Sequence, residues 1–347
     1  MEQTYWRIGR PTSAITFRLP KKTVLISAAI FAITLTLALF GLTKGMLPLT
    51  LPQVLQALQG DGSPTLQTVV TQWRLPRAVM AVVTGAALGI SGAIFQSLLR
   101  TPLGSPDVIG FNTGAYTGAL ITVILLKGSY LQMAMGSLLG GCLTAVLIYL
   151  LAWQNGVARF RLIIVGIAVS AILNALNIWL MMSATQESAM SAALWSVGSL
   201  NGITWEKSLP TGIICFVFML VCLALARPMQ ILEMGDDLAL AMGVNPNRTR
   251  AVLMLAATAL TAAATAITGP ISFIALAAPQ IAQRLTQGAS LSLICSAAMG
   301  SLLLLTADFV AQHLFMPTQL PVGIITISIG GIYLIALLLR EARKQHL

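Results

Sequence analysis

Apolar runs of membrane-spanning length recur along this 347-residue chain, and they constrain its fold more than any other feature. A helix needs about 20 predominantly apolar residues to cross the hydrocarbon core of a bilayer. Runs bounded by charge, proline or glycine that meet or approach this length are 23–43, 78–99, 108–126, 131–153, 162–182, 209–226, 251–268, 270–287, 291–315 and 321–340. The sequence therefore predicts an all-α fold, a polytopic membrane helix bundle of about ten transmembrane helices.

One run, 270–287, leaves two interpretations open. It contains Pro279 and ends in the polar pair Gln283 and Arg284. It either crosses the membrane or forms a re-entrant segment that is buried in protein. No Gly/Ser-rich linker divides the chain, so we expect residues 1–347 to form a single transmembrane domain.

The composition excludes several classes of protein. Only 9% of the residues are charged, against about 25% in a soluble domain. The net charge of +10 lies at the termini and between apolar runs, which fits charge held at a membrane surface better than nucleic-acid binding. Four cysteines lie inside apolar runs without Cys-x-x-Cys spacing, and the two histidines are isolated, so we expect no metal site and no cofactor.

The distribution of basic residues predicts the orientation. If the N-terminus is cytoplasmic, fifteen of the twenty lysines and arginines fall in cytoplasmic segments. This bias agrees with the positive-inside rule and places both termini inside. Residues 1–22 then form a cytoplasmic N-terminal segment, 227–250 form a cytoplasmic loop, and 44–77 lie outside.

Small residues recur at four-residue spacing in several runs. The patterns are Gly85-xxx-Gly89-xxx-Ala93, Gly114-xxx-Gly118 and Gly136-xxx-Gly140. In lipid, small residues let helix backbones approach closely, so we interpret these faces as packing surfaces.

A polar stripe follows one face of the run 162–182. Ser170, Asn174, Asn177 and Met181 are separated by four, three and four residues, so they share a helix face. Asparagine in hydrocarbon is costly unless it faces protein or a water-filled path. The stripe either makes interhelical hydrogen bonds or lines a translocation path.

The loop 227–250 predicts a short exposed helix. Asp236 is expected to cap it, Asp237 adds negative charge to its first turn, and Gly243 suits its end. Its body, Leu238 to Met242, is apolar. It is either an ordinary loop helix or a lever that a cytoplasmic partner grips.

The sequence carries no sign of catalysis. It has no Walker A motif, so the chain does not hydrolyse ATP itself, and it shows no catalytic constellation. Asp308 is the only carboxylate well inside a run, towards its outer end, so an ion-coupled secondary transporter is the weaker alternative. We expect a transport protein, not an enzyme.

Long motifs in a fixed order support a more specific interpretation. They are WRLPR at 73–77, GAALGISGAIFQSLLRTPLGSPDVIGFNTGA at 85–115, LEMGDDLALAMGV at 232–244, GPISFIALAAPQIAQR at 269–284 and QLPVGIITISIGG at 319–331. The chain from 43 to 340 resembles the permease subunits of ABC importers for iron chelates and vitamin B12. SPDVIGFNTGA, RLIIVGI, LWSVGSLNG and GGIYLIALLL are most similar to members that carry ferric enterobactin, a catecholate siderophore; heme or vitamin B12 are the alternative cargoes.

This resemblance implies a set of partners in a bacterial inner membrane. A second permease subunit, expected to be a different chain, would pair with this one, and a periplasmic siderophore-binding protein would dock through Arg74 and Arg77. These arginines could instead only anchor a helix at the interface. Two cytoplasmic ATPase subunits would dock on the loop at Glu233, Gly235, Asp236, Asp237, Leu240, Ala241, Met242 and Gly243.

The chain departs from the family pattern at three glutamines. Many relatives have Pro-His where this chain has Pro279-Gln280. Gln312 and Gln319 stand where some members have a further arginine and a glutamate near the last periplasmic loop. A third basic docking contact is therefore not expected in this subunit.

Overall fold

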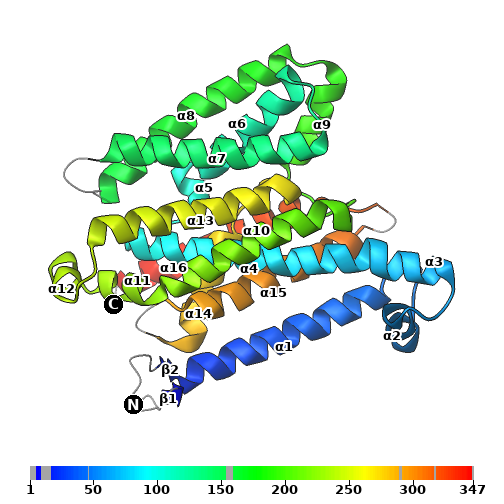
Figure 1. Cartoon of the computed structure of the whole chain (residues 1–347), viewed down its shortest axis with the longest axis horizontal. Coiled ribbons are helices and arrows are strands. Elements are labelled where there is room, and N and C mark those ends of the chain that lie inside the picture. Colours follow the sequence, from blue (N-terminus) through cyan, green and yellow to red (C-terminus); the bar gives the residue numbers. More distant parts are fainter. Residues whose placement is uncertain are drawn as a thin grey trace.

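The computed structural model describes residues 5–8, 17–45, 47–153, 159–288, 291–315 and 318–345. Over these residues the chain is a bundle of long helices preceded by a two-stranded antiparallel hairpin (Figure 1). The elements are β1 (Tyr5–Ile8), β2 (Phe17–Pro20), α1 (Lys21–Thr43), α2 (Leu51–Gln59), α3 (Pro64–Gln67), η1 (Thr68–Arg74), α4 (Leu75–Leu99), α5 (Pro106–Ile109), α6 (Phe111–Leu120), η2 (Ile121–Leu125), α7 (Tyr130–Ala152), α8 (Arg159–Ser183), α9 (Gln186–Ser196), α10 (Trp205–Ala224), α11 (Ala226–Glu233), α12 (Asp236–Ala241), α13 (Pro246–Thr268), α14 (Ile274–Thr286), α15 (Leu293–His313) and α16 (Val322–Gln345).

The helices confirm the predicted fold class. In the described part of the chain, seven helices are long and apolar enough to cross a membrane, and two shorter apolar helices, 111–125 and 322–335, add to them. Together with α14 they follow the predicted runs in order. Among the helices outside those runs is α9, which was not foreseen from the sequence.

The bundle has two distinct ends (Figure 1). We call the end that carries α2 and α3 the α2 end, and the opposite end, which carries α11, α12 and the β1–β2 hairpin, the α12 end. The helices α6 to α9 form one side of the bundle, α4, α10 and α13 lie in the middle, and α1, α14 and α15 lie on the other side.

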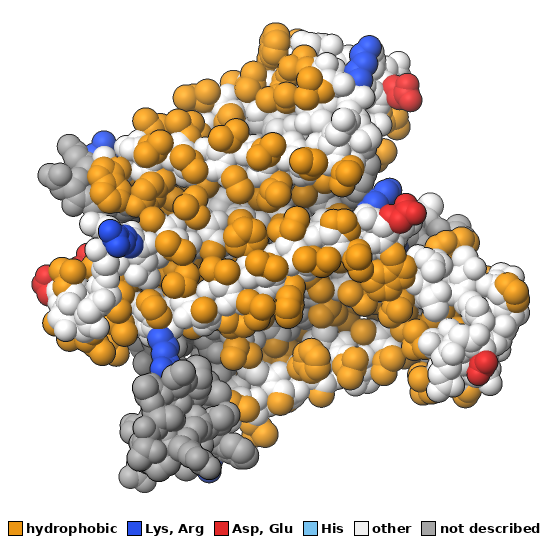
Figure 2. Space-filling view, in the orientation of Figure 1, with side chains coloured by type: hydrophobic (Ala, Val, Ile, Leu, Met, Phe, Trp, Pro, Cys, Tyr) orange, Lys and Arg blue, Asp and Glu red, His pale blue; other side chains and the backbone are white. Residues whose placement is uncertain are grey.

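Burial separates a central layer from a lipid-facing one. Most residues of α4 and α13 are buried, whereas α1, α8 and α10 expose most of their apolar side chains. Figure 2 shows hydrophobic side chains covering the middle of one face, with the charged side chains gathered at its two ends. Such an apolar belt with polar ends fits a bilayer solvent.

The small-residue faces are confirmed as packing surfaces. On α4, an added Cβ at Gly85 would lie 2.5 Å from the backbone oxygen of Gly300 on α15. Gly118 on α6 and Gly136 on α7 meet in the same way, each facing the other's backbone. The glycines therefore allow backbones to touch, which is what holds helices together in lipid.

The run 270–287 is a short helix with a non-helical approach. Residues 269–273 are not helical, and α14 begins only at Ile274, after Phe273 at φ +70°. With 13 residues α14 is about 20 Å long, which is less than the hydrocarbon thickness. Its first half is buried among other helices, which both interpretations of this run allow.

Candidate functional site

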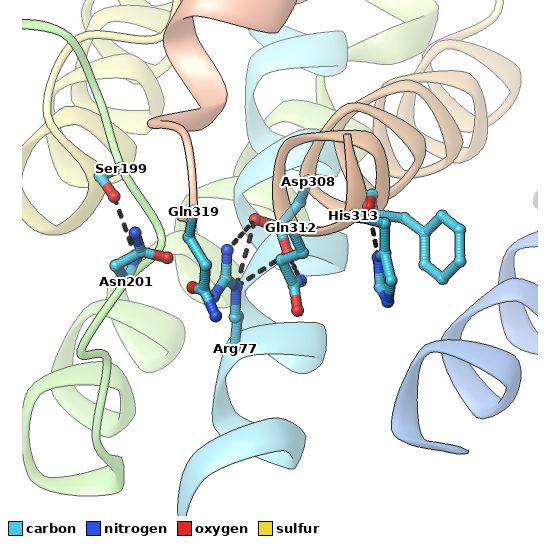
Figure 3. Close-up of polar contacts among 8 residues, drawn as sticks. Arg77, Ser199, Asn201, Asp308, Gln312, His313 and Gln319 are labelled. Carbon is cyan, nitrogen blue, oxygen red and sulfur yellow. Dashed lines mark hydrogen bonds and ion pairs between the residues drawn. The ribbon is translucent and has the colours of Figure 1, made fainter. Parts of the chain in front are cut away.

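Arg77 lies in a polar cluster at the α2 end (Figure 3). Its guanidinium forms a two-pronged ion pair with Asp308 of α15: Nη2 donates to Oδ1 at 2.8 Å, and Nε donates to Oδ2 at 3.0 Å. Its Nη1 donates to Gln319 Oε1 at 2.9 Å, and Gln312 Nε2 donates to Asp308 Oδ2 at 2.7 Å. The cluster thus ties α4 to α15 and to the segment that leads into α16.

Arg74 is also engaged inside the chain. Its Nη1 donates to the carbonyl of Leu42 at 2.7 Å, and its Nη2 donates to the carbonyl of Leu47 at 2.6 Å. These bonds satisfy carbonyls at and beyond the end of α1, where no intrahelical donor is available. Lys44 lies nearby with its Nζ 5.3 Å from the centre of the Phe40 ring.

A pocket of about 220 Å³ brings these groups together. Its lining includes Lys44, Trp73, Arg74, Arg77 and Asp308. The structure therefore places both predicted docking arginines at one pocket. It also gives each of them a partner within the chain that the sequence did not indicate.

The predicted short helix is present as α12. Gly235 at φ +127° precedes it and Gly243 at φ +79° follows it, both in backbone conformations that favour glycine. The prediction that Asp236 caps the helix is wrong, because Gly235 occupies the cap position and Asp236 is the first helical residue. The Asp236 carboxylate instead accepts two hydrogen bonds from Arg250 of α13, the longer at 3.0 Å.

The apolar surface of α12 is exposed at the α12 end. Leu240 and Met242 are 59% and 57% exposed, whereas Ala239 is buried against the bundle. Exposed apolar side chains on a short surface helix are typical of a protein-protein contact. Ala241 and Asp237 are exposed on the same element.

Glu233 connects the neighbouring helix α11 to α4. Its carboxylate accepts a hydrogen bond from Ser97 Oγ at 2.6 Å, and Arg100 Nη2 donates to the carbonyl of Leu232 at 2.8 Å. Burial raises the pKa of Glu233, against the Ser97 hydrogen bond and the Arg100 charge, which lower it. Beside this contact lies a polar cavity of about 410 Å³, lined in part by Gln96 and Gln280.

The polar stripe on α8 divides between two environments. Asn174 is exposed, whereas Asn177 is 4% exposed and neither of its amide atoms has a hydrogen-bond partner among the described residues. Ser170 Oγ donates to the carbonyl of Gly166 at 2.7 Å, and Met181 packs on the cluster around Leu180. The four side chains therefore do not form one open surface in the single chain.

Two further polar contacts were not foreseen. Asp107 accepts a hydrogen bond from Asn112, whose Oδ1 accepts in turn from Thr265 Oγ1 at 3.3 Å, joining α5, α6 and α13. Gln280 Nε2 donates to Gln96 Oε1 at 2.7 Å, and both side chains are buried. The Gln280 departure therefore has a structural role, a hydrogen bond between α14 and α4.

Comparison with known proteins identifies the family. The FecCD transport family profile matches residues 31–340. The chain belongs to this family. It is 52% identical to the ferric enterobactin transport system permease protein FepG of Escherichia coli, over 93% of this chain and 96% of that protein.

More distant relatives agree with this. The chain is 33% identical to the iron(3+)-hydroxamate import system permease protein FhuG of Bacillus subtilis, over 92% of this chain and 98% of the relative. Among solved structures it is similar to an inward-facing conformation of a putative metal-chelate type ABC transporter. The TM-score is 0.82 and the identity 27%, over 93% of this chain and all of the other. The resemblance to permease subunits of ABC importers for iron chelates and vitamin B12, stated from the motifs, is thereby confirmed.

Within this FecCD family member, the sequence located the candidate site residues along the chain better than it located their partners in space. The α12 residues and the α8 stripe lie on the helices predicted for them, whereas Arg74 and Arg77, expected in the outside segment 44–77, lie in η1 and α4. The partners that were missed, Asp308 above all, lie far away in the chain. Local spacing carries no information about such pairs.

Proposed function

We propose that this chain is a permease subunit of an ATP-driven ABC importer, and that its cargo is ferric enterobactin or a closely related catecholate siderophore. The observation that carries this proposal is the 52% identity to FepG over nearly the full length of both chains. The chain itself is a transport permease, and ATP hydrolysis belongs to a separate subunit.

The α12 end is proposed to face the cytoplasm of a bacterial cell. The positive-inside distribution of basic residues supports this, since α12 lies in the loop 227–250 on the side that holds most of them. The N-terminal hairpin lies at the same end, so the N-terminal segment is cytoplasmic as well. The α2 end, with its cationic pocket, then faces the periplasm.

Three kinds of partner complete the importer. A second permease subunit, expected to be a different chain, pairs with this one in the membrane. Two cytoplasmic ATPase subunits contact α12, where Leu240 and Met242 offer an apolar surface. A periplasmic siderophore-binding protein docks at the pocket that contains Arg74 and Arg77.

The contacts around α12 support its role as a lever. Movement of α12 reaches α13 through the Asp236–Arg250 ion pair. Movement of α11 reaches α4 through the Glu233–Ser97 hydrogen bond. Of the seven long apolar helices, α4 and α13 are the most buried. A shift of α12 would therefore move helices at the centre of the bundle, and not only its surface.

The α8 face that carries Ser170, Asn174, Asn177 and Met181 is proposed to border the translocation path. Asn174 is exposed to the outside of the single chain. Within the described part of the chain Asn177 is buried without a hydrogen-bond partner, which is costly unless a buried water contributes one in the assembled importer. An uncharged polar lining would let a large anionic cargo pass without binding tightly.

The test is expression of the tagged chain in an E. coli strain that lacks FepG. We expect the host ATPase to co-purify and uptake of radioactive iron as ferric enterobactin to return, while ferric hydroxamate uptake stays unchanged. Co-purification without ferric enterobactin uptake would contradict the cargo. Uptake driven by a proton gradient, without an associated ATPase, would contradict the importer class and favour an ion-coupled transporter.

A further inference from the structure

The helix α2 exposes part of its apolar face at one end of the bundle (Figure 1). Its own sequence defines both of its ends. At the start the Thr50 N–H donates to Gln53 Oε1 at 2.9 Å, and Gly60 at φ +88° follows the last residue. Pro52 in the first turn also suits a helix start. The faces on which the α2 side chains lie are therefore fixed by a well-defined helix.

The apolar side chains of α2 form two sets. Val54 and Ala57 are buried and pack with Leu42 of α1 and Val70 of η1. The second set lies beside them at i, i+4 and i+7, which places it along one face of the helix. We call this set the leucine stripe, and it consists of Leu51, Leu55 and Leu58. These side chains are 51%, 47% and 39% exposed, so the chain itself covers them only in part.

The other side of α2 is polar and carries no charge. The glutamines Gln53, Gln56 and Gln59 lie opposite the apolar residues and are exposed. No charged residue occurs between Lys44 and Asp61. A helix with a marked apolar face, an opposite polar face and modest overall hydrophobicity is typical of one that lies in the plane of a membrane surface.

The position of α2 along the bundle matches the edge of the hydrocarbon. The helix α1 has 23 residues and is about 34 Å long, slightly more than the hydrocarbon thickness of about 30 Å. Its last turn, which includes Leu42, therefore lies near the boundary between hydrocarbon and headgroups. Because α2 packs on Leu42, it lies at the same boundary. Trp73 of η1, the other element on which α2 packs, is exposed, and tryptophan is typical of this level.

Exposed apolar side chains lead from α1 to the leucine stripe. On α1 they include Leu35 and Phe40, and Leu47 in the connection to α2 is exposed as well. The exposed face of α1 is part of the apolar belt that faces lipid. A protein seated on the leucine stripe would have to displace the lipid that adjoins this face, whereas lipid can cover both surfaces at once. Continuity with the lipid-facing surface of α1 therefore favours lipid over a protein as the partner of the stripe.

We propose that α2 lies in the surface of the bilayer at the α2 end, with the leucine stripe among the acyl chains of that leaflet and the three glutamines in water. The partner is lipid, and the proposal depends on neither the cargo nor a protein partner. Arg74 Nη2 donates to the carbonyl of Leu47, four residues before α2. A lipid-bound α2 therefore also fixes the connection between α1 and α4.

The test measures the depth of α2 in the bilayer with spin labels, in the importer reconstituted in nanodiscs. One cysteine is introduced at a time in a Cys142→Ser background, in which the other three cysteines are buried. A label at Leu55→Cys should be accessible to oxygen, shielded from a water-soluble nickel chelate, and located about 5–10 Å below the headgroup boundary. Gln56→Cys, one residue away on the polar face, is the matched control and should be accessible to the nickel chelate. Leu35→Cys on the exposed face of α1 is the reference for a label in the hydrocarbon.

A second position on the leucine stripe repeats the measurement. Leu58→Cys, about one turn further along, should give the same result as Leu55→Cys. Equal accessibility of Leu55→Cys and Gln56→Cys to the nickel chelate would place the stripe in water and overturn the proposal. A Leu55→Cys label that neither oxygen nor the nickel chelate reaches would mean that a protein covers the stripe, and this result would overturn it as well.

Discussion

The contact between α4 and α15 makes a quantitative prediction about stability. An added Cβ at Gly85 would lie 2.5 Å from the oxygen and 2.9 Å from the carbon of the Gly300 carbonyl, whereas ordinary contact begins at 3.4 Å. The obstacle is backbone and cannot rotate away, so the helices must separate by about 1 Å. Overpacking of this kind costs up to about 3 kcal/mol, and alanine returns about 1 kcal/mol through helix propensity. Gly85→Ala should therefore destabilise the chain by about 2 kcal/mol.

A glycine elsewhere in the bundle is the matched control. Gly212 on α10 has no described atom within 4 Å of its added Cβ and no positive φ, so Gly212→Ala should stabilise the chain by up to about 1 kcal/mol. Thermal unfolding in detergent can be followed with a thiol-reactive fluorophore, because Cys215, Cys222 and Cys295 are buried and unpaired. The two midpoints should move in opposite directions. A rise or no change for Gly85→Ala would refute the close approach of α4 and α15.

The Arg77–Asp308 ion pair and the exposed surface of α12 each give a testable prediction. Arg77→Met should lower the free energy of unfolding by about 3–5 kcal/mol, because it leaves the buried Asp308 carboxylate without its counter-ion. The double variant Arg77→Met with Asp308→Leu should recover most of that loss in the same thermal assay. An equal loss in the double variant would contradict the pairing. Leu240→Asp or Met242→Asp should leave the chain in the membrane but lower ATP-driven uptake about tenfold or more, as expected for residues at the centre of a subunit contact. Gln56→Asp, at an exposed residue on the opposite end, should transport normally, and full uptake with the α12 variants would exclude α12 as the lever.

The overall architecture was predictable because few backbone conformations satisfy all hydrogen-bonding groups within a bilayer. Backbone polar groups within a bilayer must be paired inside the same segment, so apolar runs become helices. The boundary agrees closely where a charge ends the run, as at Arg100 after α4, whereas α13 begins at Pro246, five residues before the predicted run 251–268. The short helix α12 was predicted from local signals, the acidic residues Asp236 and Asp237 at its start and Gly243 at its end, although Gly235 rather than Asp236 caps it.

Features that depend on neighbours in space were not predictable. Hydropathy could not show that α14 begins only at Ile274, because buried non-helical backbone at 269–273 is as apolar as a helix. Nor could it show that Asp236 pairs with Arg250 instead of capping α12. In both cases the deciding interaction is with another element, which a local pattern does not specify.

The Arg77–Asp308 pair was predictable in part from the sequence. A carboxylate well inside a membrane-spanning run requires a partner, and only five basic residues were assigned to the outer side. The sequence thus narrows the partner of Asp308 to a few cations without choosing one. The packing of α4 on α15 determines which cation pairs with Asp308. Gly85 touches Gly300 where the two antiparallel helices cross. Arg77 lies eight residues before Gly85, and Asp308 lies eight residues after Gly300. Equal offsets of about 12 Å bring the two charges to the same level. The glycine motif and the arginine motif are therefore parts of one helix–helix interface, in which the close backbone contact brings Arg77 rather than another arginine level with Asp308.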